Sequence, residues 1–71
     1  MEEGVLYLGE KLRLSRLRAG IATQKELSKR TGISPTIISD LERGRRDLSY
    51  TWANRIAEVV GIPTKALMEE E

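Results

Sequence analysis

The sequence predicts a small all-α domain of five short helices. Its 71 residues leave room for only one hydrophobic core. The alternation of β-branched and polar residues that is typical of strands is missing. Four glycines, each placed after a stretch of helical apolar spacing, are candidate helix caps: Gly20, Gly32, Gly44 and Gly61.

The first helix is expected over residues 8–19, where side chains at helical spacing share one face. The second is expected over 24–31, with Thr23 as its N-cap and Glu26 completing a capping box. The side chains expected on the inner faces of these two helices are those of Leu8, Leu12, Arg16, Ala19 and Leu27.

The third helix is expected over residues 35–43, because Ser34 is a good N-cap and proline is favoured at the first helical position. The fourth, over 50–60, is capped by Ser49, and a short fifth helix spans about 63–69. The side chains expected to point inward from these helices are Ile38, Leu41, Ala53, Ile56, Ala57, Val60 and Leu67.

The connection between the second and third helices is only four residues long, Thr31-Gly32-Ile33-Ser34. Gly32 can adopt positive φ at little cost, and Ser34 restarts a helix at once. A link this short makes the two helices cross steeply. This is the geometry of a helix-turn-helix, whose second helix fits the DNA major groove.

The composition excludes several classes of function. Cysteine and histidine are absent, which removes disulfides, the usual zinc sites and Ser-His-Asp chemistry. No phosphate-binding glycine loop or paired carboxylates appear, so an enzyme is not expected. The longest apolar run, residues 5–8, is too short to span a bilayer, and residues 1–4 do not resemble a signal peptide. We therefore expect a cytoplasmic, nucleoid-associated protein without metal or cofactor.

Charge is unevenly distributed along the chain. All twelve Lys and Arg lie within residues 11–65, whereas residues 1–10 and 66–71 carry only acidic charges. A basic middle between acidic ends suggests a surface for a polyanion. An ordinary solvated surface on a small domain is the alternative at this point.

The segment 24–44 resembles the lambda-repressor-like helix-turn-helix family of the Cro and phage-repressor type, also called the xenobiotic-response-element family. It matches the family signature without a gap, and residues 8–20 and 49–67 resemble the family's other helices. The link at residues 21–23 is one residue longer than is usual in the family. The predicted organisation is an N-terminal arm (1–7), a helix-turn-helix DNA-binding domain (8–68) and an acidic tail (69–71).

This resemblance implies a set of DNA-contacting residues. Gln24 matches a glutamine that contacts the DNA backbone, at a helix N-terminus that favours phosphate. The expected phosphate contacts are Thr23, Gln24, Lys25, Arg43, Arg45 and Arg46, and the expected base-readout residues are Pro35, Thr36, Ile37, Ser39 and Asp40. Because proline donates nothing and no bidentate side chain stands at the readout positions, DNA shape is expected to contribute to specificity.

Three assignments keep alternatives. Ile37 either contacts a thymine methyl or packs toward the fourth helix, and Asp40 either accepts a bond from cytosine N4 or pairs with Arg43. Arg16 and Glu42 match a partly buried ion pair of the family, and Arg16 is also a candidate for a phosphate contact. The alternative for these two is a pair of unrelated surface charges.

The resemblance implies sequence-specific binding to double-stranded DNA by a small transcriptional regulator, with repression as the expected mode. A homodimer would place two copies of the third helix about one helical turn apart on a palindromic operator. The competing hypothesis is a protein-interaction module, such as an antitoxin-type partner that uses the same fold.

Overall fold

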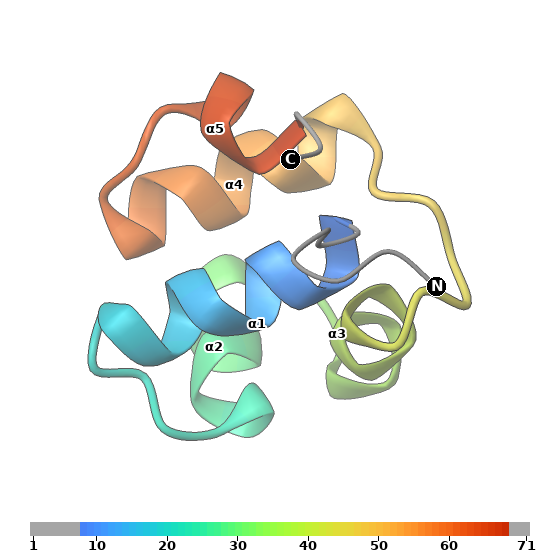
Figure 1. Cartoon of the computed structure of the whole chain (residues 1–71). Helices are drawn as coiled ribbons and strands as arrows, with labels where there is room; N and C mark the ends of the chain where they lie inside the picture. The colour runs from blue at the N-terminus through green and yellow to red at the C-terminus, as the bar shows by residue number, and fades with distance from the viewer. Residues whose placement is uncertain (1–7, 69–71) are drawn as a thin grey trace.

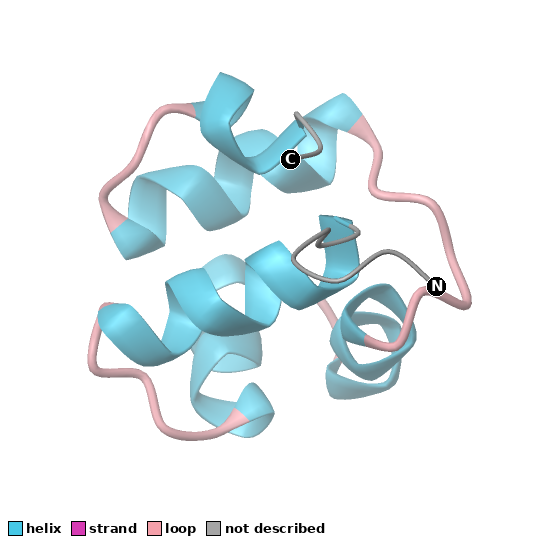
Figure 2. Cartoon of the chain, viewed as in Figure 1, coloured by secondary structure: helices cyan, strands magenta, loops and turns pink. Residues whose placement is uncertain are grey.

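A computed structural model describes residues 8–68, and the expected arm and acidic tail lie outside the described residues. Within 8–68 the chain forms helices and no strands, which confirms the predicted all-α class (Figure 2). The five helices are α1 (Leu8–Arg18), α2 (Gln24–Thr31), α3 (Pro35–Glu42), α4 (Tyr50–Val60) and α5 (Thr64–Met68).

Helix α1 lies across the middle of the domain and packs against α3, α4 and α5 (Figure 1). Helices α4 and α5 pack together on one side of α1, while α2 and α3 form the other side (Figure 1). One core fills the space between them. Its buried apolar side chains are Leu12, Ile21, Leu27, Ile33, Ile38, Leu41, Ala53, Ile56, Ala57, Val60 and Leu67.

The predicted N-caps begin the three central helices. Thr23, Ser34 and Ser49 each accept a hydrogen bond from the backbone N–H three residues further on, at 3.1, 3.2 and 3.2 Å. Each bond satisfies a backbone donor that the helix cannot satisfy itself. Helices α2, α3 and α4 therefore start at the residues that the sequence predicts.

The capping box at α2 is only half formed. The Thr23 hydroxyl accepts from the Glu26 backbone, but the Glu26 carboxylate pairs with Arg30 one turn later, at 2.9 Å. Opposite charges four residues apart on a helix are neighbours, so this pair competes with the expected reciprocal bond.

The link between α1 and α2 contains a core residue, Ile21, although the sequence predicts an ordinary linker there. Ile21 is buried, and its N–H donates to the Arg16 carbonyl (3.1 Å) while the Gly20 N–H donates to the Leu17 carbonyl (3.0 Å). These two bonds form a Schellman motif, which turns the residue after the glycine back onto the helix. As a result Ile21 enters the core, whereas Ala19, expected on the inner face, is exposed.

The turn between α2 and α3 has the predicted form. Gly32 has φ 78°, and its N–H donates to the Ser28 carbonyl at 2.8 Å. The Thr31 hydroxyl donates to the Leu27 carbonyl (2.8 Å) and accepts from the Ile33 N–H (3.2 Å). The buried Ile33 side chain then fastens the turn to the core. These contacts fix the direction in which α3 leaves α2.

Candidate nucleic-acid interface

Helix α3 has a buried side and an outward side. Ile38, Leu41 and Glu42 are buried, and they hold the helix against the rest of the domain. Pro35 and Thr36, at its first turn, are exposed. At this first turn the outward side is left open by the described residues, as a helix that enters a DNA groove requires.

The remaining expected readout residues are half-buried. Ser39 and Asp40 lie at the border between the two sides of α3. Ile37 packs against the hydrophobic core, which favours the packing role over contact with a thymine methyl. The polar groups that remain for base edges are those of Thr36, Ser39 and Asp40.

Three exposed arginines follow α3 directly. A second Schellman motif at Gly44 reverses the chain, with N–H bonds from Gly44 to the Leu41 carbonyl (3.2 Å) and from Arg45 to the Asp40 carbonyl (2.9 Å). Gly44 has φ 76°, which is costly for any residue with a Cβ. This turn keeps all three cationic side chains beside the end of α3: Arg43, Arg45 and Arg46.

Asp40 pairs with an arginine, but the partner differs from the expected one. Its Oδ2 lies 3.8 Å from Nη2 of Arg46, whereas Arg43 was the expected partner. The turn at Gly44 folds the chain back, which brings a residue six positions away toward the carboxylate. The Arg46 guanidinium carbon also lies 5.8 Å from the centroid of the Trp52 ring on α4, within the range of a cation–π contact.

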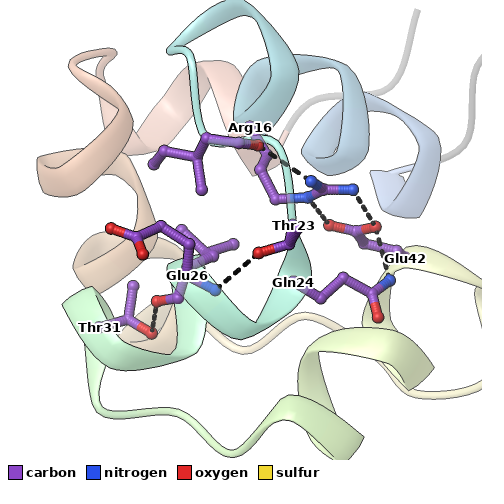
Figure 3. A network of polar contacts seen from close by, with 8 residues as sticks. Arg16, Thr23, Gln24, Glu26, Thr31 and Glu42 are labelled. Carbon is purple, nitrogen blue, oxygen red and sulfur yellow. Dashed lines mark hydrogen bonds and ion pairs between the residues drawn. The ribbon is translucent and has the colours of Figure 1, made fainter.

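A buried polar network connects three helices behind the interface (Figure 3). Arg16 on α1 donates to both oxygens of the Glu42 carboxylate on α3, at 2.8 and 3.3 Å. Its remaining terminal nitrogen donates to the Ile21 carbonyl at 3.0 Å. The side chains of Arg16 and Glu42 are 7% and 2% exposed. Arg16 is thus enclosed by its partners, which favours the ion pair over a phosphate contact.

Gln24, at the start of α2, is the third member of this network. Its Nε2 donates to Oε1 of Glu42 at 2.9 Å (Figure 3). Sequence reasoning missed this bond, since the two residues are 18 positions apart and only tertiary folding brings them together. The neighbouring Thr23 and Lys25 are exposed at the same helix end. The network therefore links the α2 N-terminus, an anion-favouring site, to the end of α3.

The comparisons with known proteins agree with this geometry. A model of the helix-turn-helix domain family matches residues 7–70, and the chain belongs to this family of DNA-binding regulators, which are not enzymes. The chain is also similar to the control protein C.BamHI of Bacillus amyloliquefaciens. The two are 33% identical over 64 residues, which cover 90% of this chain and 79% of that protein. DNA-binding transcription regulation is thus the general function.

Two further observations concern the part of the chain that the structure describes. None of its helices has the length and apolar character needed to cross a membrane. Residues 8–68 also contain no group of three or more acidic, His or Cys side chains placed to hold a metal ion.

Proposed function

We propose that this chain is a transcriptional repressor that binds a palindromic operator as a homodimer, with α3 of each subunit in the major groove. The observation that carries the proposal is the outward side of α3, exposed at its first turn and followed by three exposed arginines. Two subunits would read half-sites about one helical turn apart. Occupation of the operator would then block the polymerase, in the cytoplasm at the nucleoid.

The two sets of DNA contacts have separate roles in this proposal. Phosphate contacts from Thr23, Gln24 and Lys25 would hold one end of the helix-turn-helix, and the arginines after α3 would hold the other. Base edges would be read by Thr36, Ser39 and Asp40, with Pro35 shaping the approach. Since Ile37 packs against the core and is less available for a base contact, DNA shape would take a larger part in specificity.

Selection of bound duplexes from a random DNA pool tests the proposal most directly. We expect enrichment of a palindromic sequence, because symmetric subunits read symmetric half-sites. The spacing of the half-sites also reports the distance between the two α3 helices. Enrichment of an asymmetric site would contradict the homodimer, and no enrichment would favour the protein-interaction alternative.

Charge reversal tests the phosphate contacts. The variant R43E/R45E/R46E should bind the selected operator far more weakly. Its binding constant should also depend less on salt, with a slope of log K against log salt that is shallower by about three units. The variant R13E/R18E/R55E is a matched control, because it reverses three exposed arginines on α1 and α4. If the two variants lost equal affinity for the operator, the loss would follow from net charge alone, which would contradict the assigned phosphate contacts.

A further inference from the structure

Arg46 is held between side chains of the two helices that its loop connects. It lies 3.8 Å from the Asp40 carboxylate on α3, and its guanidinium carbon lies 5.8 Å from the ring centroid of Trp52 on α4. The Arg46 side chain is still 47% exposed, and that of Asp40 is 27% exposed. The arginine is therefore partly neutralised within the chain and also open to a ligand at the surface.

The contact between Asp40 and Arg46 is weak enough to be exchanged. A separation of 3.8 Å exceeds that of a charge-assisted hydrogen bond, and exposed ion pairs are weakened further by salt. A DNA phosphate offers the guanidinium a shorter, bidentate contact. Arg46 thus has two competing anionic partners, one within the chain and one on DNA.

Asp40 is poorly suited to a DNA surface unless a base satisfies it. Its carboxylate is repelled by phosphates, and the base group that it can accept a hydrogen bond from in the major groove is an exposed amino group, above all cytosine N4. On a duplex without a base amino group at this position, the Asp40 carboxylate still requires a cation beside it. Arg46 is the cation that the structure places beside it.

We propose that Asp40 is a specificity-determining residue that acts through Arg46. In the free protein and on non-cognate DNA, Asp40 keeps Arg46 as its counterion and weakens the phosphate contact of that arginine. At a cognate site a base amino group donates a hydrogen bond to the Asp40 carboxylate. The Arg46 guanidinium is then released and contacts a phosphate of the DNA backbone. This inference rests on the proposed DNA-binding function and adds to it a reason why the basic cluster does not bind every duplex alike.

Pairing of Asp40 with Arg46 would increase the difference between the affinities for cognate and non-cognate DNA. Phosphate contacts are independent of sequence, so three unrestrained arginines would strengthen cognate and non-cognate binding together. An internal carboxylate that must be satisfied lowers the affinity for the wrong sequence more than for the right one. Such a difference matters because non-specific sites far outnumber operators.

The test compares two variants that remove the same charge. Asp40→Asn removes the counterion of Arg46, and Asp47→Asn removes an exposed carboxylate from the same loop. Affinities for the selected operator and for a scrambled duplex are measured by fluorescence anisotropy at several salt concentrations. D40N should bind the scrambled duplex about five- to tenfold more tightly, with a salt slope steeper by about one unit, as expected for one added phosphate contact.

The control variant D47N should change the affinity for the scrambled duplex less than twofold. A change of this size is expected from one unit of net charge that is screened by salt. The gain of D40N should disappear in D40N/R46A relative to R46A, because the gain passes through Arg46. Equal gains in D40N and D47N, or a gain that persists without Arg46, would overturn the inference. A wild-type chain that binds no duplex would instead overturn the proposed function itself.

Trp52 supplies an independent readout, since it is the one tryptophan of the chain and lies beside Arg46. The emission of the free wild type should differ from that of R46A. Operator DNA should move the wild-type emission toward that of R46A, and the scrambled duplex should move it less. Identical emission changes with the two duplexes would contradict a release of Arg46 that depends on the sequence.

Discussion

The buried ion pair between α1 and α3 makes a quantitative prediction. Glu42→Gln keeps the size of the side chain but removes the charge that faces the Arg16 guanidinium. Arg16 is 7% exposed, so its cation would stay buried opposite a neutral amide. Removal of one partner from a buried pair costs about 3–5 kcal/mol. We expect about 3 kcal/mol here, because the amide oxygen of glutamine still accepts one hydrogen bond.

This cost is large for a domain of 71 residues. At about 0.05–0.15 kcal/mol per residue, the total free energy of unfolding is about 4–11 kcal/mol. The melting temperature should therefore fall by about 12–24 °C, since 1 kcal/mol shifts it by about 4–8 °C in a domain of this size. Urea denaturation followed by circular dichroism measures the free energy, and a thermal scan measures the midpoint.

Glu26→Gln is the matched control for this substitution. It makes the same chemical change in an exposed pair, in which Arg30 and Glu26 are 56% and 43% exposed. An exposed pair of this spacing contributes about 0.3–0.5 kcal/mol. If E42Q and E26Q destabilised the chain equally, the reasoning from burial would be refuted.

Three smaller predictions concern the helix-turn-helix. Leu27→Ala should lower the free energy of unfolding by about 3 kcal/mol in urea, because Leu27 is fully buried; a loss below 1 kcal/mol would contradict that burial. Gly32→Ala should cost about 1–2 kcal/mol from backbone strain alone, since φ is 78° and no atom beyond the neighbouring residues lies within 4 Å of an added Cβ. Gly32→Asn should cost less. Ser34→Ala should cost about 1 kcal/mol through the lost cap, and a neutral effect would refute the capping role.

The local features of the fold were predictable from sequence. The starts of α2, α3 and α4 follow from Thr23, Ser34 and Ser49, because a capping residue acts on a backbone N–H only a few positions away. The four glycines adopt positive φ for a similarly local reason. Helix ends follow the sequence less closely: α1 and α3 stop one residue before the predicted ends, and α5 begins one residue after Pro63.

The contacts that the sequence analysis missed depend on tertiary folding. Ile21 looked like a linker residue, and only the Schellman turn after α1 shows that it enters the core. Helical spacing offers Arg43 as a partner for Asp40, but the reversal at Gly44 presents Arg46 instead. The part of Gln24 in the Glu42 network depends on how α2 crosses α3, which no local pattern specifies.

The division of α3 into a buried and an outward side has an evolutionary consequence. The residues that orient the helix are buried, among them Ile38, Leu41 and Glu42, whereas Pro35 and Thr36 are exposed at its first turn. Substitutions at such exposed positions usually change stability by less than about 0.5 kcal/mol. A lineage can therefore acquire a new target sequence by exchanging a few outward side chains, while the scaffold that aims them is inherited intact.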